Sequence, residues 1–127
     1  MILGSGIDLV EVARFEREFA RRGGDDFDDL FTPAERARFR QRRRPLIGCA
    51  AHYAAKEACF KALGTGKVGQ MSWHDLDIGV VDGRPSVTLS GETARIAREM
   101  GVDAVHLAWT RTRCRAVAWV VVSTRRS

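Results

Sequence analysis

The feature that most constrains the fold of this chain is an alanine-rich segment that runs into two glycines. Between about Leu46 and Leu63 the sequence predicts a helix, and alanines at positions 50, 51, 54 and 58 recur in it at three- and four-residue spacing. Such small residues let a neighbouring element approach closely. Gly64 and Gly66 follow, and glycine can end a helix in a left-handed conformation. We therefore expect a central packed helix and a loop whose backbone can approach a ligand.

Glu57 and Lys61 lie four residues apart on another face of this helix, with Tyr53 one turn earlier. The pair sets an anion beside a cation, as a site for magnesium and phosphate requires. Most helical pairs of this kind are solvated salt bridges, so the pair alone does not decide between the two interpretations.

The first part of the chain is expected to hold a strand and a helix. Residues 2–7 read as an apolar strand whose glycines permit close backbone approach. Asp8 and Glu11 have the spacing of a capping box, so a helix is expected to start at Asp8. Residues 23–26 (Gly-Gly-Asp-Asp) are expected to form a loop. Thr32, Pro33 and Glu35 then mark the start of a helix that should end before Pro45.

The second half is expected to hold two hairpins and a helix. Residues 76–80 alternate, Asp82-Gly83 is a turn signal, and residues 85–89 return as a strand. A helix should run from Ser90 through Met100. In the terminal hairpin, Val105, Leu107 and Trp109 are expected to alternate against Val117, Trp119 and Val121. Segregated helices and strands predict an α+β fold with a mainly antiparallel sheet, in one domain over residues 1–127.

Composition narrows the class of partner. The net charge of +5 favours an acidic partner. The basic runs at residues 36–44 and 111–115 lack a nucleic-acid motif and interleaved aromatic residues, so we expect no nucleic-acid partner. No apolar run has the length of a membrane span, so no membrane partner is expected either. The three cysteines lack CxxC spacing, which favours free thiols in the cytoplasm.

Two motifs in a fixed order give the chain a family resemblance. The stretch Gly6-Ile7-Asp8-Leu9-Val10-Glu11-Val12, followed by the helix and glycine loop at residues 54–66, resembles the holo-acyl-carrier-protein synthase family of 4′-phosphopantetheinyl transferases. The resemblance extends over nearly the whole chain. It implies Mg²⁺-dependent transfer of 4′-phosphopantetheine from coenzyme A to a serine of an apo acyl carrier protein of a fatty-acid or polyketide pathway. The serine hydroxyl would attack the β-phosphate and release 3′,5′-adenosine bisphosphate.

The resemblance also implies roles for residues that match the family motifs. Asp8 and Glu57 match the magnesium ligands, and Lys61 matches a lysine that contacts the phosphates. These three form the expected catalytic set, and Glu57 is our nominee for the general base. Coenzyme A is expected to contact Lys61 together with Gly64, Gly83, Arg84, Pro85, Thr110 and Arg111.

The expected protein contacts also follow from the resemblance. Arg14, Arg17 and Arg21 match the helix face that docks the acidic carrier protein. Family members of this length are typically homotrimers with active sites between protomers, so a trimer is expected. Plain structural interpretations stay open beside these roles, with Asp8 as a helix cap, Gly83 to Pro85 as a simple turn and the arginines as solvated surface.

Two departures from the family pattern bear on activity. His52 stands where the family usually has arginine, and Ala108 and Arg111 stand where its terminal hairpin has serine and histidine. Arg111 can bind phosphate through its guanidinium group but cannot act as a base. The alternative function is a catalytically impaired relative that binds an acyl carrier protein without modifying it. A small basic protein that binds nucleic acid is the least favoured rival, because interleaved aromatic residues are absent.

Overall fold

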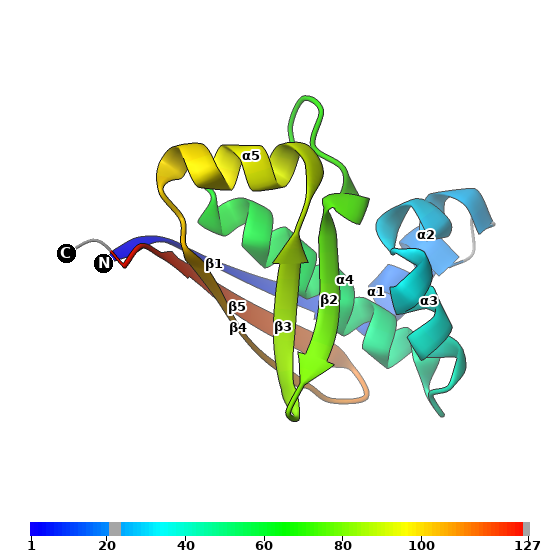
Figure 1. Ribbon diagram of the computed structural model, residues 1–127. Coiled ribbons are helices and arrows are strands. Elements are labelled where there is room, and N and C mark those ends of the chain that lie inside the picture. The colour runs from blue at the N-terminus through cyan, green and yellow to red at the C-terminus, as the bar shows by residue number, and fades with distance from the viewer. Residues whose placement is uncertain (21–23, 126–127) are drawn as a thin grey trace.

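The computed structural model describes residues 1–20 and 24–125 (Figure 1). Strand β1 (Ile2–Glu11) leads into helix α1 (Val12–Phe15), which continues as a π-helical turn, η1 (Glu16–Ala20). The other elements, in chain order, are α2 (Gly24–Leu30), α3 (Pro33–Arg40), α4 (Pro45–Ala62), the 3₁₀ turn η2 (Trp73–Asp75), β2 (Leu76–Val81), β3 (Arg84–Leu89), α5 (Gly91–Met100), β4 (Ala104–Arg111) and β5 (Arg115–Ser123).

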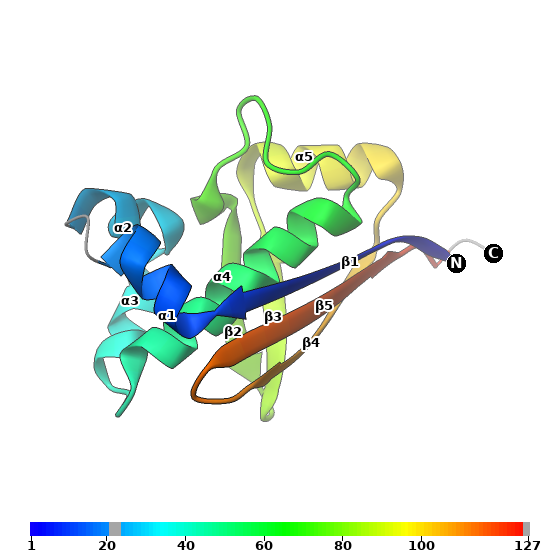
Figure 2. The same ribbon diagram turned by 180° about the vertical axis from the view of Figure 1, so that it is seen from behind.

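The strands confirm the predicted α+β class. β1, β5 and β4 form an antiparallel sheet in that order, and β2 and β3 form a separate hairpin. Figure 2 shows the three strands of the larger sheet side by side, with α1, α2 and α3 gathered at one end of α4. Among the described residues, no helix has both the length and the hydrophobicity that crossing a bilayer would require.

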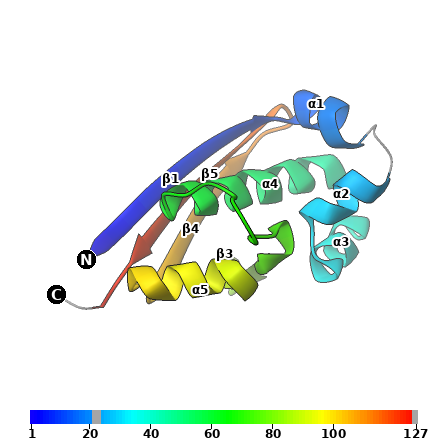
Figure 3. The ribbon, with the colours of Figure 1, turned by 90° about the horizontal axis from the view of Figure 1, so that it is seen from above.

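α4 is the helix around which the other elements pack, and it ends within one residue of each predicted boundary. It lies against β1 and β5 on one side and the β2–β3 hairpin on the other, and β3 runs beside β4 (Figure 3). The alanines at positions 50, 51, 54 and 58 are buried, as their spacing predicts. The helix is therefore enclosed on most of its surface.

The glycines of β1 bring that strand unusually close to α4. A Cβ atom on Gly6 would overlap the carbonyl oxygen of Ala58 and would lie 2.7 Å from the amide nitrogen of Ala62. A Cβ atom on Gly4 would likewise overlap the carbonyl oxygen of Ala62. Glycines on the strand and alanines on the helix thus let the two backbones approach closely. This contact places the inner face of β1 against the helix.

The helix expected to start at Asp8 begins four residues later. β1 continues through Glu11, with Asp8 opposite Ala118 and Glu11 opposite Arg115, and α1 starts at Val12. Pairing with β5 satisfies the backbone of this segment, so the capping-box interpretation of Asp8 and Glu11 is wrong. The carboxylate of Asp8 does not cap a helix and is left to bind another group.

The loop expected at residues 23–26 is also wrong from Gly24 onward, because α2 starts there. Phe27 and Phe31 are four residues apart, and their ring centroids are 5.1 Å from each other. Phe27 also lies 6.5 Å from Phe15. This apolar contact stabilises a helix whose glycine and aspartates favour a loop. The start of α3 is confirmed, since Thr32 and Glu35 form a capping box.

The terminal hairpin is present, and Val105, Leu107 and Trp109 of β4 pack against the core as expected, but the buried face of β5 is shifted by one residue. The buried residues of β5 are Ala116, Ala118, Val120 and Val122. Trp119 has an exposed fraction of 54%. Its strand partner Ile7 and Leu9, which lies on the same strand as Ile7, are exposed to 62% and 55%. Residues 116–122 are apolar on both faces, so alternation could not fix which face is buried. We call Ile7, Leu9 and Trp119 the outer-face patch.

Candidate active site

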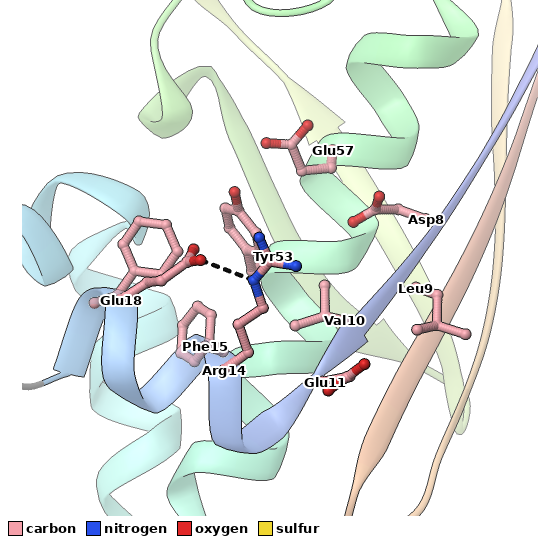
Figure 4. Close-up of a pocket in the computed structure, with 10 residues that line it drawn as sticks. Asp8, Leu9, Val10, Glu11, Arg14, Phe15, Glu18, Tyr53 and Glu57 are labelled. Carbon is pink, nitrogen blue, oxygen red and sulfur yellow. Dashed lines mark hydrogen bonds and ion pairs between the residues drawn. The ribbon is translucent and has the colours of Figure 1, made fainter.

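Three of the predicted site residues meet between β1 and α4. Lys61 Nζ lies 2.9 Å from Asp8 Oδ1 and donates to the carbonyl oxygen of Ile7 at 3.2 Å. The carboxylate of Glu57 faces the same space from α4 (Figure 4). Helix spacing favours a pair between Glu57 and Lys61, yet the ammonium binds Asp8, because the close strand–helix contact brings β1 within its reach.

A cavity of about 420 Å³ opens beside the two carboxylates. Its walls come from β1, from α1 with η1, and from α4. They are formed by Asp8, Leu9, Val10, Glu11, Arg14, Phe15, Glu18, Phe19, Tyr53 and Glu57. The cavity therefore combines four carboxylates, an arginine and an aromatic wall, which suits a ligand with a charged and an apolar part.

The carboxylate of Glu57 is half-buried, and burial raises its pKa. A hydrogen-bonding interaction with the Tyr53 hydroxyl opposes the rise, the charge of Asp8 adds to it, and the charge of Lys61 opposes it. Two carboxylates held this close repel each other when both are ionised. The site would therefore gain from a further cation.

Tyr53 is a site residue to which the sequence assigned no role. Its ring is fixed by Phe15, Phe19 and Trp73, with centroid distances of 5.5, 5.1 and 5.4 Å. Burial raises the pKa of its hydroxyl, and the nearby Glu57 raises it further, so the hydroxyl stays protonated and can donate. Its position one turn before Glu57 was the available signal.

Asp8 and Glu57 fit a hard divalent cation. Magnesium is usually held by one or two protein carboxylates, and substrate phosphates and water complete its shell. Within residues 1–20 and 24–125, no three metal-binding side chains of His, Cys, Asp or Glu gather. The donor set thus matches a shared ion better than an ion enclosed by protein ligands.

The other predicted coenzyme residues lie on a different side of α4, apart from Gly64. Gly64 ends α4 with a φ of 80°, next to Lys61. Arg111, on the far outer strand β4, lines a separate cavity of about 260 Å³ with Arg42, Arg43, Arg44, Ile47 and Gly48. This cavity shares no lining residue with the one at Asp8 and Glu57.

The cavity at Arg111 is strongly positive. Partial burial lowers the pKa of Arg42, and the charges of Arg111 and Arg38 lower it further. Such a concentration of guanidinium groups favours phosphate or another anion. The basic runs at residues 36–44 and 111–115 are both visible in the sequence, but about seventy residues separate them, so their meeting in one cavity could not be predicted from local spacing.

Asp82 and Gly83 form the turn that joins β2 to β3, Arg84 and Pro85 are the first residues of β3, and β3 runs beside β4. Asp82 and Gly83 have φ values of 52° and 77°, as a tight hairpin turn requires. Thr110 is exposed near the end of β4. A single chain therefore brings Asp8, Glu57 and Lys61 together and keeps Arg84, Thr110 and Arg111 on the side of β3 and β4.

Comparison with known proteins identifies the family. Residues 4–118 match the 4′-phosphopantetheinyl transferase superfamily. The chain belongs to this superfamily. The holo-acyl-carrier-protein synthase of Koribacter versatilis is 39% identical over 123 residues, covering 96% of this chain and 98% of the relative. That of Desulforudis audaxviator is 46% identical over 122 residues, covering 95% and 92%.

Solved structures of the superfamily share the fold. The holo-acyl-carrier-protein synthase of Neisseria meningitidis superposes with a TM-score of 0.90 at 31% identity, covering 98% of this chain and all of that one. The Helicobacter pylori enzyme, in complex with coenzyme A, superposes with a TM-score of 0.78 at 29% identity, covering 94% of this chain and 99% of that one. The resemblance found in the motifs thus extends over the chain, and the recognised family is confirmed.

Two further predicted features of the superfamily lie on different sides of α4. Arg14 lines the cavity and pairs with Glu18 at 2.9 Å, and Arg17 is exposed on η1. Arg21 lies outside the described residues. His52, which replaces an arginine, is buried on the β4 side of α4 with Nδ1 2.8 Å from the carbonyl oxygen of Gly48. Burial lowers the pKa of His52 to about 3, so it adds no positive charge at neutral pH.

Proposed function

We propose that the protein is a holo-acyl-carrier-protein synthase, which transfers 4′-phosphopantetheine from coenzyme A to a serine of an apo acyl carrier protein. The observation that carries the proposal is the meeting of Asp8, Glu57 and Lys61 in a chain of this superfamily. Relatives similar over the full length are named for this activity, and solved relatives have been crystallised with coenzyme A. The free cysteines support a cytoplasmic location.

We assign Asp8 and Glu57 to Mg²⁺ and Lys61 to the phosphates of coenzyme A. The ion, when bound, would offset the negative charge that develops on the diphosphate. The Tyr53 hydroxyl would orient Glu57, and the ammonium of Lys61 would bind a phosphate oxygen. A carboxylate has two oxygens, so Glu57 could hold the ion with one and take the serine proton with the other, directly or through water.

We further propose that the active site is shared between copies of the chain, in a homotrimer. The anion-binding cavity at Arg111 and the carboxylates at Asp8 and Glu57 lie on different sides of α4. One coenzyme molecule could use both if a neighbouring copy supplied the second half, including Arg84 and Thr110. The exposed outer-face patch of Ile7, Leu9 and Trp119 offers an apolar surface for that neighbour.

The docking of the carrier protein is assigned to the α1 side of the cavity. Arg14 and Arg17 present positive charge there, beside the carboxylates that would hold the ion. Complementary charge would speed the encounter with an acidic carrier and set its orientation.

The transfer is tested by intact-mass spectrometry of apo acyl carrier proteins incubated with the protein, coenzyme A and Mg²⁺. We expect a gain of one phosphopantetheine that is lost with chelator and in Asp8→Asn/Glu57→Gln. The control variant Glu99→Gln removes an exposed carboxylate on α5 and should retain activity. Absence of both the gain and coenzyme A binding, across several carriers, would reject the enzyme. Carrier binding without modification would favour the non-catalytic module.

The shared site is tested by mixing two impaired variants. Asp8→Asn removes a ligand of the metal ion, and Arg111→Ala weakens the anion-binding cavity that a neighbouring copy would supply. Each variant should therefore be impaired alone. In mixed trimers, some sites would combine an intact half from each variant, and activity should return. No recovery after subunit exchange would argue against sharing.

Trp119→Lys should yield monomers in light scattering and lose transfer, whereas a trimeric Trp119→Lys variant would exclude the outer-face patch as the interface.

A further inference from the structure

The ammonium of Lys61 occupies part of the candidate metal site by binding one of its carboxylates. It contacts Asp8 Oδ1 at 2.9 Å and the carbonyl oxygen of Ile7 at 3.2 Å. The side chain starts directly above Gly6, where an added Cβ atom would lie 2.9 Å from Lys61 Cβ. A larger residue at position 6 would obstruct the path of the lysine. The strand–helix contact is thus shaped to let Lys61 reach Asp8.

Lys61 also offsets the repulsion between the two carboxylates. Asp8 and Glu57 face the same space, and the positive charge of Lys61 opposes the effect of Asp8 on Glu57. Magnesium requires oxygen ligands that are free to coordinate it. An ammonium and a divalent ion that bind one small carboxylate compete through charge repulsion and through its limited number of oxygen lone pairs.

The lysine could leave Asp8 without large disturbance. Its side chain is 49% exposed, whereas that of Asp8 is 17% exposed, so the lysine is the more mobile partner. An ammonium that moved away would exchange Asp8 for another acceptor. The diphosphate of coenzyme A would supply such an acceptor at the moment when the metal needs the carboxylate.

We propose that Lys61 couples the binding of the metal to the binding of coenzyme A. When Mg²⁺ is present without coenzyme A, the ammonium of Lys61 stays on Asp8 and hinders the ion from binding there. When coenzyme A binds, the ammonium moves to the diphosphate, and Asp8 becomes free to bind the ion. Each ligand therefore tightens the binding of the other beyond the direct contact between them, and the coupling is reciprocal. This inference rests on the proposed function and adds the order in which its site is assembled.

The experiment uses Mn²⁺ as the probe ion, with free Mn²⁺ measured by electron paramagnetic resonance. The dissociation constant is determined with and without saturating coenzyme A, for the wild type and for Lys61→Met. Methionine keeps the length of the apolar stem but removes the charge. We expect Lys61→Met to bind Mn²⁺ alone about tenfold more tightly, and coenzyme A to tighten Mn²⁺ binding about tenfold less than in the wild type.

Arg14→Met is the matched control for charge. Arg14 lines the same cavity, but its guanidinium pairs with Glu18 and not with Asp8. Its removal should change Mn²⁺ binding by about twofold or less, since an exposed charge is screened by salt. If Arg14→Met tightened Mn²⁺ binding as much as Lys61→Met does, net charge alone would be responsible, and the proposal would be overturned.

Other outcomes separate this inference from the proposed function. Unchanged or weaker Mn²⁺ binding in Lys61→Met would overturn the coupling, even if the wild type transfers phosphopantetheine. A coupling with coenzyme A that Lys61→Met leaves intact would also overturn it. If the wild type transferred nothing and did not bind coenzyme A, the proposed function would fail. The titration without coenzyme would still decide whether Lys61 and the ion compete for Asp8.

Discussion

α4 carries two lysine–carboxylate pairs five residues apart, and they differ in nearly every physical respect. Lys56 is fully buried and donates to Glu35 at 2.6 Å, and to the carbonyl oxygens of Leu30 and Trp73 at 2.8 and 3.0 Å. Lys61 is half-exposed and binds Asp8 at 2.9 Å. The first pair is completely enclosed by protein, whereas the second opens onto a cavity.

The difference shows how one helix separates stability from function. Glu35 also accepts hydrogen bonds from the backbone of Thr32 and Ile78, so the Lys56–Glu35 pair joins α3, α4 and β2. Every donor and acceptor there has a fixed partner, and neither ion can leave without exposing the other to a low dielectric. Lys61 can leave Asp8 and be solvated or bind phosphate. Only the second pair is able to take part in a binding equilibrium.

The largest effect is expected from Lys56→Met, which leaves the carboxylate of Glu35 buried without its cation. The free energy of unfolding should fall by about 3–5 kcal/mol, as for other broken buried pairs. Urea denaturation followed by circular dichroism measures the change.

The double variant Lys56→Met/Glu35→Gln sharpens this result. Removal of both charges should recover part of the lost stability, because no buried ion remains uncompensated. Equal stability of the single variant and the wild type would show that Glu35 takes up a proton at no cost, and the contrast between the two pairs would fail.

A smaller effect is expected from His52, another ionisable group on the enclosed surface of α4. Burial lowers its pKa to about 3, so the unfolded chain takes up a proton near pH 6.5 and the folded chain does not. Stability is therefore fully present above pH 6.5 and falls as the pH decreases toward 3. The loss from His52 between pH 7 and 5 should be about 2 kcal/mol.

His52→Gln is the matched variant, because the amide can still donate to the carbonyl oxygen of Gly48. Unfolding is measured for both proteins from pH 7 to 5. The difference in stability between them should change with pH by the amount expected for His52. Parallel curves would show that His52 is already protonated in the folded chain.

The smallest effect on stability is expected from Lys61→Met. An ion pair with a half-exposed lysine contributes at most about 1 kcal/mol, so the free energy of unfolding should stay within that range of the wild type. The same substitution is expected to abolish most of the transfer, which the mass assay measures. A stability loss as large as that of Lys56→Met would remove the distinction between the pairs.

The sequence predicted the elements whose signals are local. Pro45, the first residue of α4, and Gly64, which follows the helix, allowed its ends to be predicted to within one residue, and the capping box of Thr32 and Glu35 fixed the start of α3. The capping box at Asp8 failed because the competing interaction, pairing with Ala118, involves a residue far along the chain. The buried face of β5 could not be chosen, since both of its faces are apolar.

The candidate site was predictable to a similar extent. Asp8, Glu57 and Lys61 were available from the motifs, but the pairing of Lys61 with Asp8 depends on the register of β1 along α4. The separation of Arg111 from these residues depends on strand order, because β5 lies between β1 and β4. Neither relation is encoded in local spacing.

The strand order also bears on when the site can form during synthesis. In the described sheet, β1 pairs with β5 alone, so residues 2–11 have no strand partner until residues 115–123 have left the ribosome (Figure 2). α4 is made early, but the strand that carries Asp8 gains its hydrogen-bonded partner only when β5 is synthesised. This connectivity gives the chain a high contact order, which slows folding. A ribosome-stalled chain that ends before Arg115 should therefore leave Asp8 and Glu57 unassembled.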